Sequence, residues 1–198
     1  MPKKVLLLLA EGFEEVEAVT PLDYLQRAGI EVTSAAVGLD KGTKSLAVKG
    51  VHGITLIADT QLEVLAAEGS LSTSLWDGVV IPGGGPGSDK LAASAETGAF
   101  LKEMAAADKW ICAICAAPAR VLFPLGILNG KSFTCFPGGE EKVIANSQGA
   151  MWKEDRVVVD GNLITSRAAG TAGEFACAII EKIESPDEAK TLIERVMM

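Results

Sequence analysis

The sequence predicts an α/β protein with a mostly parallel central sheet and helices on both of its faces. Three short segments are apolar on both faces, as in strands that are covered on both sides, and they span residues 5–10, 77–84 and 109–115. Between these segments lie longer stretches rich in Ala, Leu, Glu and Lys, which favour helices. Strands that alternate with helices in this way usually form a parallel sheet, because each helix carries the chain back to the start of the next strand.

Capping residues indicate where several of the helices begin and end. The first helix ends at Gly29, a typical residue after a helix C-terminus. Thr171 and Glu174 form a T-x-x-E capping box, and Ser185 followed by Pro186 is typical of a helix start. The predicted helices span 14–29, 88–108, 117–126, 171–183 and 185–197, and further strands span 31–37 and 162–166.

Length, charge and cysteine content exclude several classes of protein. The 198 residues suit one domain, which we expect to span 1–198. A formal net charge of -8 argues against a nucleic-acid partner, and no apolar run approaches the length of a membrane span. We expect a cytoplasmic protein whose four cysteines stay reduced.

Glycine-rich loops and possible metal ligands give little support to a cofactor. The stretch PGGGPG at 82–87 does not match G-x-G-x-x-G, and GILNGKS at 126–132 has three residues between its glycines instead of the four of a phosphate loop. The cysteines lack the paired C-x-x-C spacing of a zinc site. His52, the only histidine, is interpreted as a surface residue, so we expect neither a metal nor a nucleotide.

Two cysteines, Cys112 and Cys115, are spaced C-x-x-C, but the pattern differs from that of a dithiol redox pair. In such pairs both thiols lie at a helix start, whereas Cys112 lies within the predicted strand and suits a buried core position. Cys115 lies at the corner between the predicted strand and helix. Ala116 follows it directly, and Pro118 lies three residues after it. The helix dipole at that corner predicts a lowered pKa and a reactive thiolate. The alternative is that both cysteines are buried and inert.

Glu17 is the candidate partner of Cys115. It shares a helical stripe with Pro21, Leu25 and Ala28, at the spacing of a core-facing side. Burial raises the pKa of a carboxyl group, and a protonated Glu17 can donate a hydrogen bond to a thiolate or an oxidised sulfur. The glycines of 82–87, Gly83 and Gly84 among them, are expected to supply backbone N–H groups as an oxyanion hole.

These motifs together resemble the ThiJ/PfpI superfamily, specifically its parkinsonism-associated deglycase branch with bacterial YajL-like relatives. The resemblance implies a flavodoxin-like three-layer sandwich, commonly a homodimer, without a cofactor. Four segments carry the resemblance, and with their even spacing they extend over essentially the whole chain: 9–30, 79–87, 111–122 and 163–180.

The resemblance also implies roles for individual residues. Cys115 matches the family's oxidisable nucleophile, Glu17 the acid that hydrogen-bonds it, and Gly84 and Ala116 the backbone donors around it. Members resemble redox sensors, protective chaperones, or enzymes that act on glyoxals or glycated groups. All of these functions need an exposed thiolate.

The sequence departs from the family pattern in two places. Many relatives have a T-H-P segment, whereas this chain reads TCFP with Phe136 in place of the histidine, so a histidine-assisted mechanism is not supported. The family's S-R-G-P-G-T turn reads SRAAGT, which includes Arg167 and is expected at the pocket rim. Cys135 is a further thiol near the site, either a resolving partner or incidental.

Three hypotheses about function follow. The first is an oxidative-stress-responsive cysteine protein with weak glyoxalase or protein deglycase activity on reactive carbonyls, carried by Cys115 and assisted by Glu17. The alternative is a non-catalytic redox sensor or chaperone that binds client proteins and whose Cys115 oxidises to a sulfinic acid. A class I amidotransferase or cysteine protease is a distant third, because it needs a histidine at the site.

Overall fold

The central element of the molecule is one sheet of mostly parallel strands. The computed structural model describes residues 2–39, 43 and 45–198. Its strand order is β10-β11-β7-β6-β1-β2-β5, and all neighbours are parallel except β10 and β11. The strands are β1 (Lys4–Ala10), β2 (Glu31–Val37), β5 (Thr60–Gln61), β6 (Gly78–Ile81), β7 (Trp110–Ile114), β10 (Val157–Asp160) and β11 (Leu163–Ser166).

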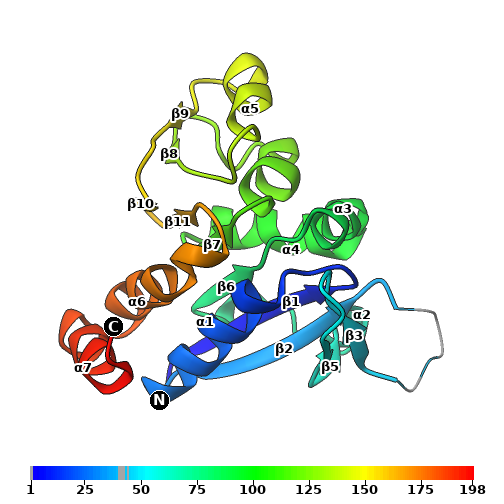
Figure 1. The fold of residues 1–198 in the computed structure, drawn as a ribbon. Coiled ribbons are helices and arrows are strands. Elements are labelled where there is room, and N and C mark those ends of the chain that lie inside the picture. The colour runs from blue at the N-terminus through cyan, green and yellow to red at the C-terminus, as the bar shows by residue number, and fades with distance from the viewer. Residues whose placement is uncertain (1, 40–42, 44) are drawn as a thin grey trace.

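Helices cover both faces of this sheet, which confirms the predicted fold class (Figure 1). One face carries α1 (Glu15–Arg27), α6 (Ala172–Ile183) and α7 (Pro186–Val196). The other carries α2 (Leu62–Ala67), α3 (Gly85–Ala93) and α4 (Ala95–Ala106). Smaller elements are the hairpin β3 (Ala47–Lys49) and β4 (Thr55–Ile57), and a lobe of β8 (Ser132–Phe133), α5 (Glu140–Asn146) and β9 (Met151–Trp152).

Strand β1 shows how the sheet divides the core into two layers. Val5, Leu7 and Leu9 pack beneath α1 and α6, while the alternate residues Leu6 and Leu8 pack on the other side with α4. All five side chains are fully buried, and burying one such side chain stabilises the fold by about 1.5–3 kcal/mol. A strand buried on both faces must be apolar at every position, which is the pattern that identified it.

Two segments that the sequence predicted as single α-helices have a different structure. The segment 88–108 forms two helices, because Ser94 ends α3 and its hydroxyl accepts a hydrogen bond from the Thr97 N–H at 3.1 Å, which caps α4. The segment 117–126 forms a π-helical turn over Pro118–Leu122 and a 3₁₀ turn over Phe123–Leu125. Pro124 has no N–H to continue an α-helical ladder at that point.

Of the two helix caps predicted near the end of the chain, one is wrong and one is confirmed. The predicted capping box of α6 is wrong, because the Thr171 hydroxyl bonds to Ser166 Oγ at 2.6 Å and Glu174 pairs with Arg156 at 2.7 Å. The predicted cap of α7 is confirmed, since Ser185 accepts a hydrogen bond from the Glu188 N–H at 3.1 Å. Within the described part of the chain, no helix has both the length and the apolar character needed to cross a membrane.

Candidate active site

Three neighbouring strands deliver the predicted site residues to one edge of the sheet. Glu17 follows β1, Gly83 and Gly84 follow β6, and Cys115 follows β7. The strands β1, β6 and β7 are adjacent and parallel, so their carboxyl ends meet. This edge is where ligands bind in open α/β sheets.

The backbone at Cys115 is held in a conformation that L-residues rarely adopt. Its φ angle is 64°, in the left-handed region, and such a residue costs about 1–3 kcal/mol. Two hydrogen bonds hold it there: the Cys115 N–H donates to Ser166 O at 2.9 Å, and the Cys115 carbonyl accepts from the Phe136 N–H at 2.8 Å. The predicted sharp corner is therefore present. Cys112, by contrast, is fully buried in the core, and both thiols are free.

Glu17 lies buried against Cys115. Only 1% of its surface is exposed, its Oε2 accepts a hydrogen bond from the Gly83 N–H at 2.9 Å, and it is hydrogen-bonded to the Cys115 thiol and the Ala169 N–H. Burial raises the pKa of Glu17 to about 7, with a further increase from the charge of Glu14, although the hydrogen bonds act in the opposite direction. Glu17 therefore exchanges its proton near neutral pH.

The expected lowering of the Cys115 pKa is wrong. Burial and then the Glu17 charge and hydrogen bond raise the pKa of Cys115 to about 12, against the N–H groups of Gly84 and Ala116, which lower it. The segment after Cys115 is a π turn followed by a 3₁₀ turn, so it lacks the regular α-helical dipole on which the prediction depended. A protonated Glu17 removes the repelling charge and can donate to the sulfur, so the Cys115 pKa is raised less when Glu17 carries the proton, although burial still raises it.

The two glycines after β6 serve different purposes. A side chain at Gly83 would lie 2.6 Å from Cys115 Cβ and would overlap Glu17 Oε2, so only glycine lets the pair meet. The Gly83 N–H holds Glu17, so it is not available for the oxyanion role that we expected. Gly84 has a φ of 85° and directs its N–H toward the Cys115 sulfur, as does Ala116.

A cavity of about 610 Å³ opens beside Cys115, and Cys115 is the one cysteine of the described chain that lines it. Phe136 is among the lining residues, and the sequence did not indicate two cationic residues on the cavity wall, Arg120 and Lys142. Arg120 makes two hydrogen bonds to the carboxylate of Asp89, at 2.8 and 2.9 Å. The lining residues are Asp89, Cys115, Ala116, Ala119, Arg120, Pro124, Phe136, Pro137, Gly138, Gly139 and Lys142.

The other two predicted pocket residues, Cys135 and Arg167, are not among the described residues that line this cavity. Cys135 is fully buried, and its thiol lies 3.5 Å from the Phe136 carbonyl oxygen. Burial and then the charge of Glu140 raise the pKa of Cys135 to about 12. Arg167 donates to the Glu154 carbonyl at 3.1 Å. In the described part of the chain neither residue borders the cavity, so neither is placed to contact a ligand there.

The sequence also did not indicate that the backbone N–H of Ala169 binds Glu17. Its N–H donates to Glu17 from the turn after β11, the same SRAAGT segment that departs from the family pattern. Any residue other than proline can supply a backbone N–H, so the residue type carried no signal.

Comparisons with known proteins agree with this geometry. The sequence profile of the DJ-1/PfpI family matches residues 3–182. Protein dj-1beta of Drosophila melanogaster is 37% identical over 100% of this chain and 98% of its own length. The chain spans 41% of Protein DJ-1 homolog B of Arabidopsis thaliana, to which it is 38% identical.

A solved structure and a protein named as an enzyme are also similar to this chain. The oxidised DJ-1 of Toxoplasma gondii superposes with a TM-score of 0.87, at 34% identity and 98% coverage of both chains. The Caenorhabditis elegans protein named Glutathione-independent glyoxalase DJR-1.2 is 33% identical over 96% of this chain and 93% of its own length. The chain belongs to the DJ-1/PfpI family.

Proposed function

We propose that this chain is an oxidative-stress protein with weak glyoxalase or protein deglycase activity on small reactive carbonyls and glycated groups. The observation that carries the proposal is the position of Cys115, which borders an open cavity in a strained turn and is hydrogen-bonded to Glu17. The related glyoxalase of C. elegans supports the choice of substrate class. No cofactor takes part in the proposed reaction.

The proposed reaction of methylglyoxal begins with addition of the Cys115 thiolate, beside a protonated Glu17, to the aldehyde carbon. The new C–S bond forms as the carbonyl π bond breaks, and the resulting alkoxide takes the proton held by Glu17, which gives a hemithioacetal. The N–H groups of Gly84 and Ala116, which face the sulfur, are placed to stabilise negative charge beside it.

In the second stage Glu17, now a carboxylate, removes the proton from the former aldehyde carbon, and an enediolate forms. Glu17 returns this proton to the neighbouring carbon, and the hydroxyl proton moves from the first oxygen to the second, which gives a lactoyl thioester on Cys115. Water hydrolyses the thioester to lactate and regenerates the thiol, so methylglyoxal and water become lactic acid without any external oxidant. Glu17 serves as the acid and the base because Phe136 occupies the position where many relatives have histidine.

Lactate production from methylglyoxal tests this proposal. We expect turnover in the wild type and its loss in Cys115→Ser and Glu17→Ala. Cys177→Ser is the matched control, because Cys177 is a free cysteine on α6 that does not border the cavity, and it should retain full turnover. Wild-type levels of lactate from Cys115→Ser would refute the proposal.

The alternative, a redox sensor without turnover, is favoured by the surroundings of the sulfur. Peroxide would convert the thiolate to a sulfenate with release of water, and a second peroxide would give the sulfinate. The Glu17 proton and the two N–H groups can hydrogen-bond the new oxygens. Intact mass after mild peroxide should show two added oxygen atoms, absent in Cys115→Ser. Oxidation with no lactate from the wild type would favour the sensor, and an unmodified Cys115 would contradict both functions.

We further propose a single-domain, cytoplasmic homodimer of the YajL-like branch that can also bind client proteins. Exposed apolar side chains on α1 and around the β3–β4 hairpin support a self-association surface, and they include Val16, Ile54 and Ile57. Light scattering during size-exclusion chromatography should give twice the chain mass of 20.6 kDa, and a monomer at all concentrations would contradict the dimer.

A further inference from the structure

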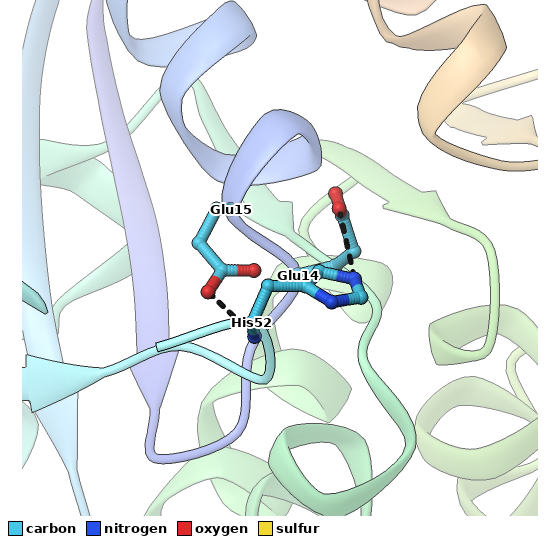
Figure 2. A group of neighbouring side chains, drawn as sticks. All are labelled: Glu14, Glu15 and His52. Carbon is cyan, nitrogen blue, oxygen red and sulfur yellow. Dashed lines mark hydrogen bonds and ion pairs between the residues drawn. The ribbon is translucent and has the colours of Figure 1, made fainter. Parts of the chain in front are cut away.

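A second group of polar side chains lies outside the cavity, where α1 begins. Glu14 and Glu15 stand at the N-terminus of α1, and the turn between β3 and β4 brings His52 against them (Figure 2). Each residue offers one possible ligand atom, and these atoms all lie within 4.8 Å of one another. The His52 Nε2 is 3.9 Å from Glu14 Oε1.

Glu15 is the most informative member because it is buried and only half paired. It is 4% exposed, and its Oε1 accepts hydrogen bonds from the His52 N–H at 2.7 Å and the Ile54 N–H at 3.3 Å. Its Oε2 is also buried but has no hydrogen-bond partner among the described residues. Figure 2 shows that this second oxygen points to the side on which the His52 imidazole lies. A buried polar atom without a partner destabilises the fold, so a ligand at this oxygen would stabilise the protein.

Glu14 presents its carboxylate to the same place. Its Oε2 caps α1 by accepting the Glu17 N–H at 2.8 Å, which leaves Oε1 directed toward His52. Gly50 leaves room for the neighbouring carboxylate, since a side chain there would overlap Glu15. Two adjacent carboxylates and an imidazole thus converge in a chain whose net charge is -8, where a cation is attracted.

We propose that Glu14, Glu15 and His52 form a binding site for a divalent transition-metal ion, with Zn²⁺ as a suitable occupant. Ligands at about 2.0–2.2 Å from zinc lie roughly 3.4 Å from one another in a tetrahedron. The His52 side chain is 72% exposed in the single chain, beside the surface that we propose for self-association, and it can turn to close the remaining gap. One nitrogen and two carboxylate oxygens suit a first-row metal better than Ca²⁺, and water can complete the coordination.

His52 makes the test direct, because it is the only histidine in the chain. In protein without a histidine tag, the single imidazole NMR signal should shift on addition of one equivalent of Zn²⁺, and calorimetry should show one ion per chain. His52→Ala, Glu14→Gln and Glu15→Gln should each weaken binding at least about tenfold, since even residues behind metal ligands change affinity by 10–100-fold. Glu14→Gln keeps an oxygen that can cap α1.

Two control variants distinguish this site from other possible zinc-binding sites on the chain. Cys115→Ser removes the thiol of the cavity and should leave the affinity unchanged, as should Glu96→Gln at an exposed carboxylate on α4. Because the His52 side chain is exposed, we expect His52→Ala to fold, and it is the decisive variant if Glu15→Gln does not fold. Unchanged binding in His52→Ala, an unshifted imidazole signal, or loss of binding in Cys115→Ser would each overturn the proposal.

Discussion

The buried carboxyl of Glu17 should make the stability of the protein depend on pH. Burial raises the pKa of this group from 4.5 to about 7 in the folded chain. A group with a higher pKa in the folded state binds its proton more tightly there, so it favours folding at low pH. That contribution is lost as the pH rises from about 4.5 through about 7. At about 1.4 kcal/mol per pKa unit, the difference corresponds to about 3 kcal/mol.

Glu17→Gln isolates this contribution, because the amide cannot ionise but its oxygen can still accept the Gly83 N–H. Urea unfolding at about pH 5 and about pH 8 should show that the variant gains about 2–3 kcal/mol relative to the wild type at the higher pH, because part of the contribution is already lost at pH 5. Glu103→Gln, at an exposed position on α4, is the control and should show no such difference. A pH-independent effect of Glu17→Gln, or a gain at low pH, would refute the reasoning.

Three further predictions concern turns of the backbone. Gly83→Ala should lose methylglyoxal turnover and about 1–3 kcal/mol in urea unfolding, because the methyl overlaps Glu17 and Cys115; full activity would contradict this. Cys115→Gly should be more stable than Cys115→Ala by about 1 kcal/mol, since glycine relieves the positive φ, and equal melting curves would argue against strain. Ser94→Ala should cost about 1 kcal/mol through loss of the α4 cap, and a change below a few tenths of that would show that the cap is unimportant.

The parts of this structure that were predictable from sequence are those with strong local patterns. Long apolar runs marked β1, β6 and β7, and the helical stripe through Glu17 correctly placed that side chain toward the core. Because parallel strands end at one edge, the meeting of Glu17 with Cys115 followed from the fold class. Strands of two or three residues, such as β3, β4, β8 and β9, are too short to show a period and were missed.

The remaining features depend on distances through space. The direction of the Cys115 pKa depends on how completely the thiol is buried beside a carboxylate, which no spacing in the sequence reveals. His52 lies 37 residues from Glu15, and only the packing of the β3–β4 hairpin on α1 brings them together. Gly83 also does not have the oxyanion role that we predicted, because its N–H donates a hydrogen bond to Glu17.

The left-handed turn at Cys115 ties the chemistry of the thiol to the integrity of the whole sheet. The turn is held by the backbone of Ser166 at the end of β11 and of Phe136 beyond β7, and the neighbouring Glu17 comes from the segment after β1. No short stretch of the chain contains all of these groups. A nascent or unfolded chain would therefore present an ordinary, solvated cysteine, so the rate at which Cys115 reacts with peroxide can serve as an internal gauge of native assembly.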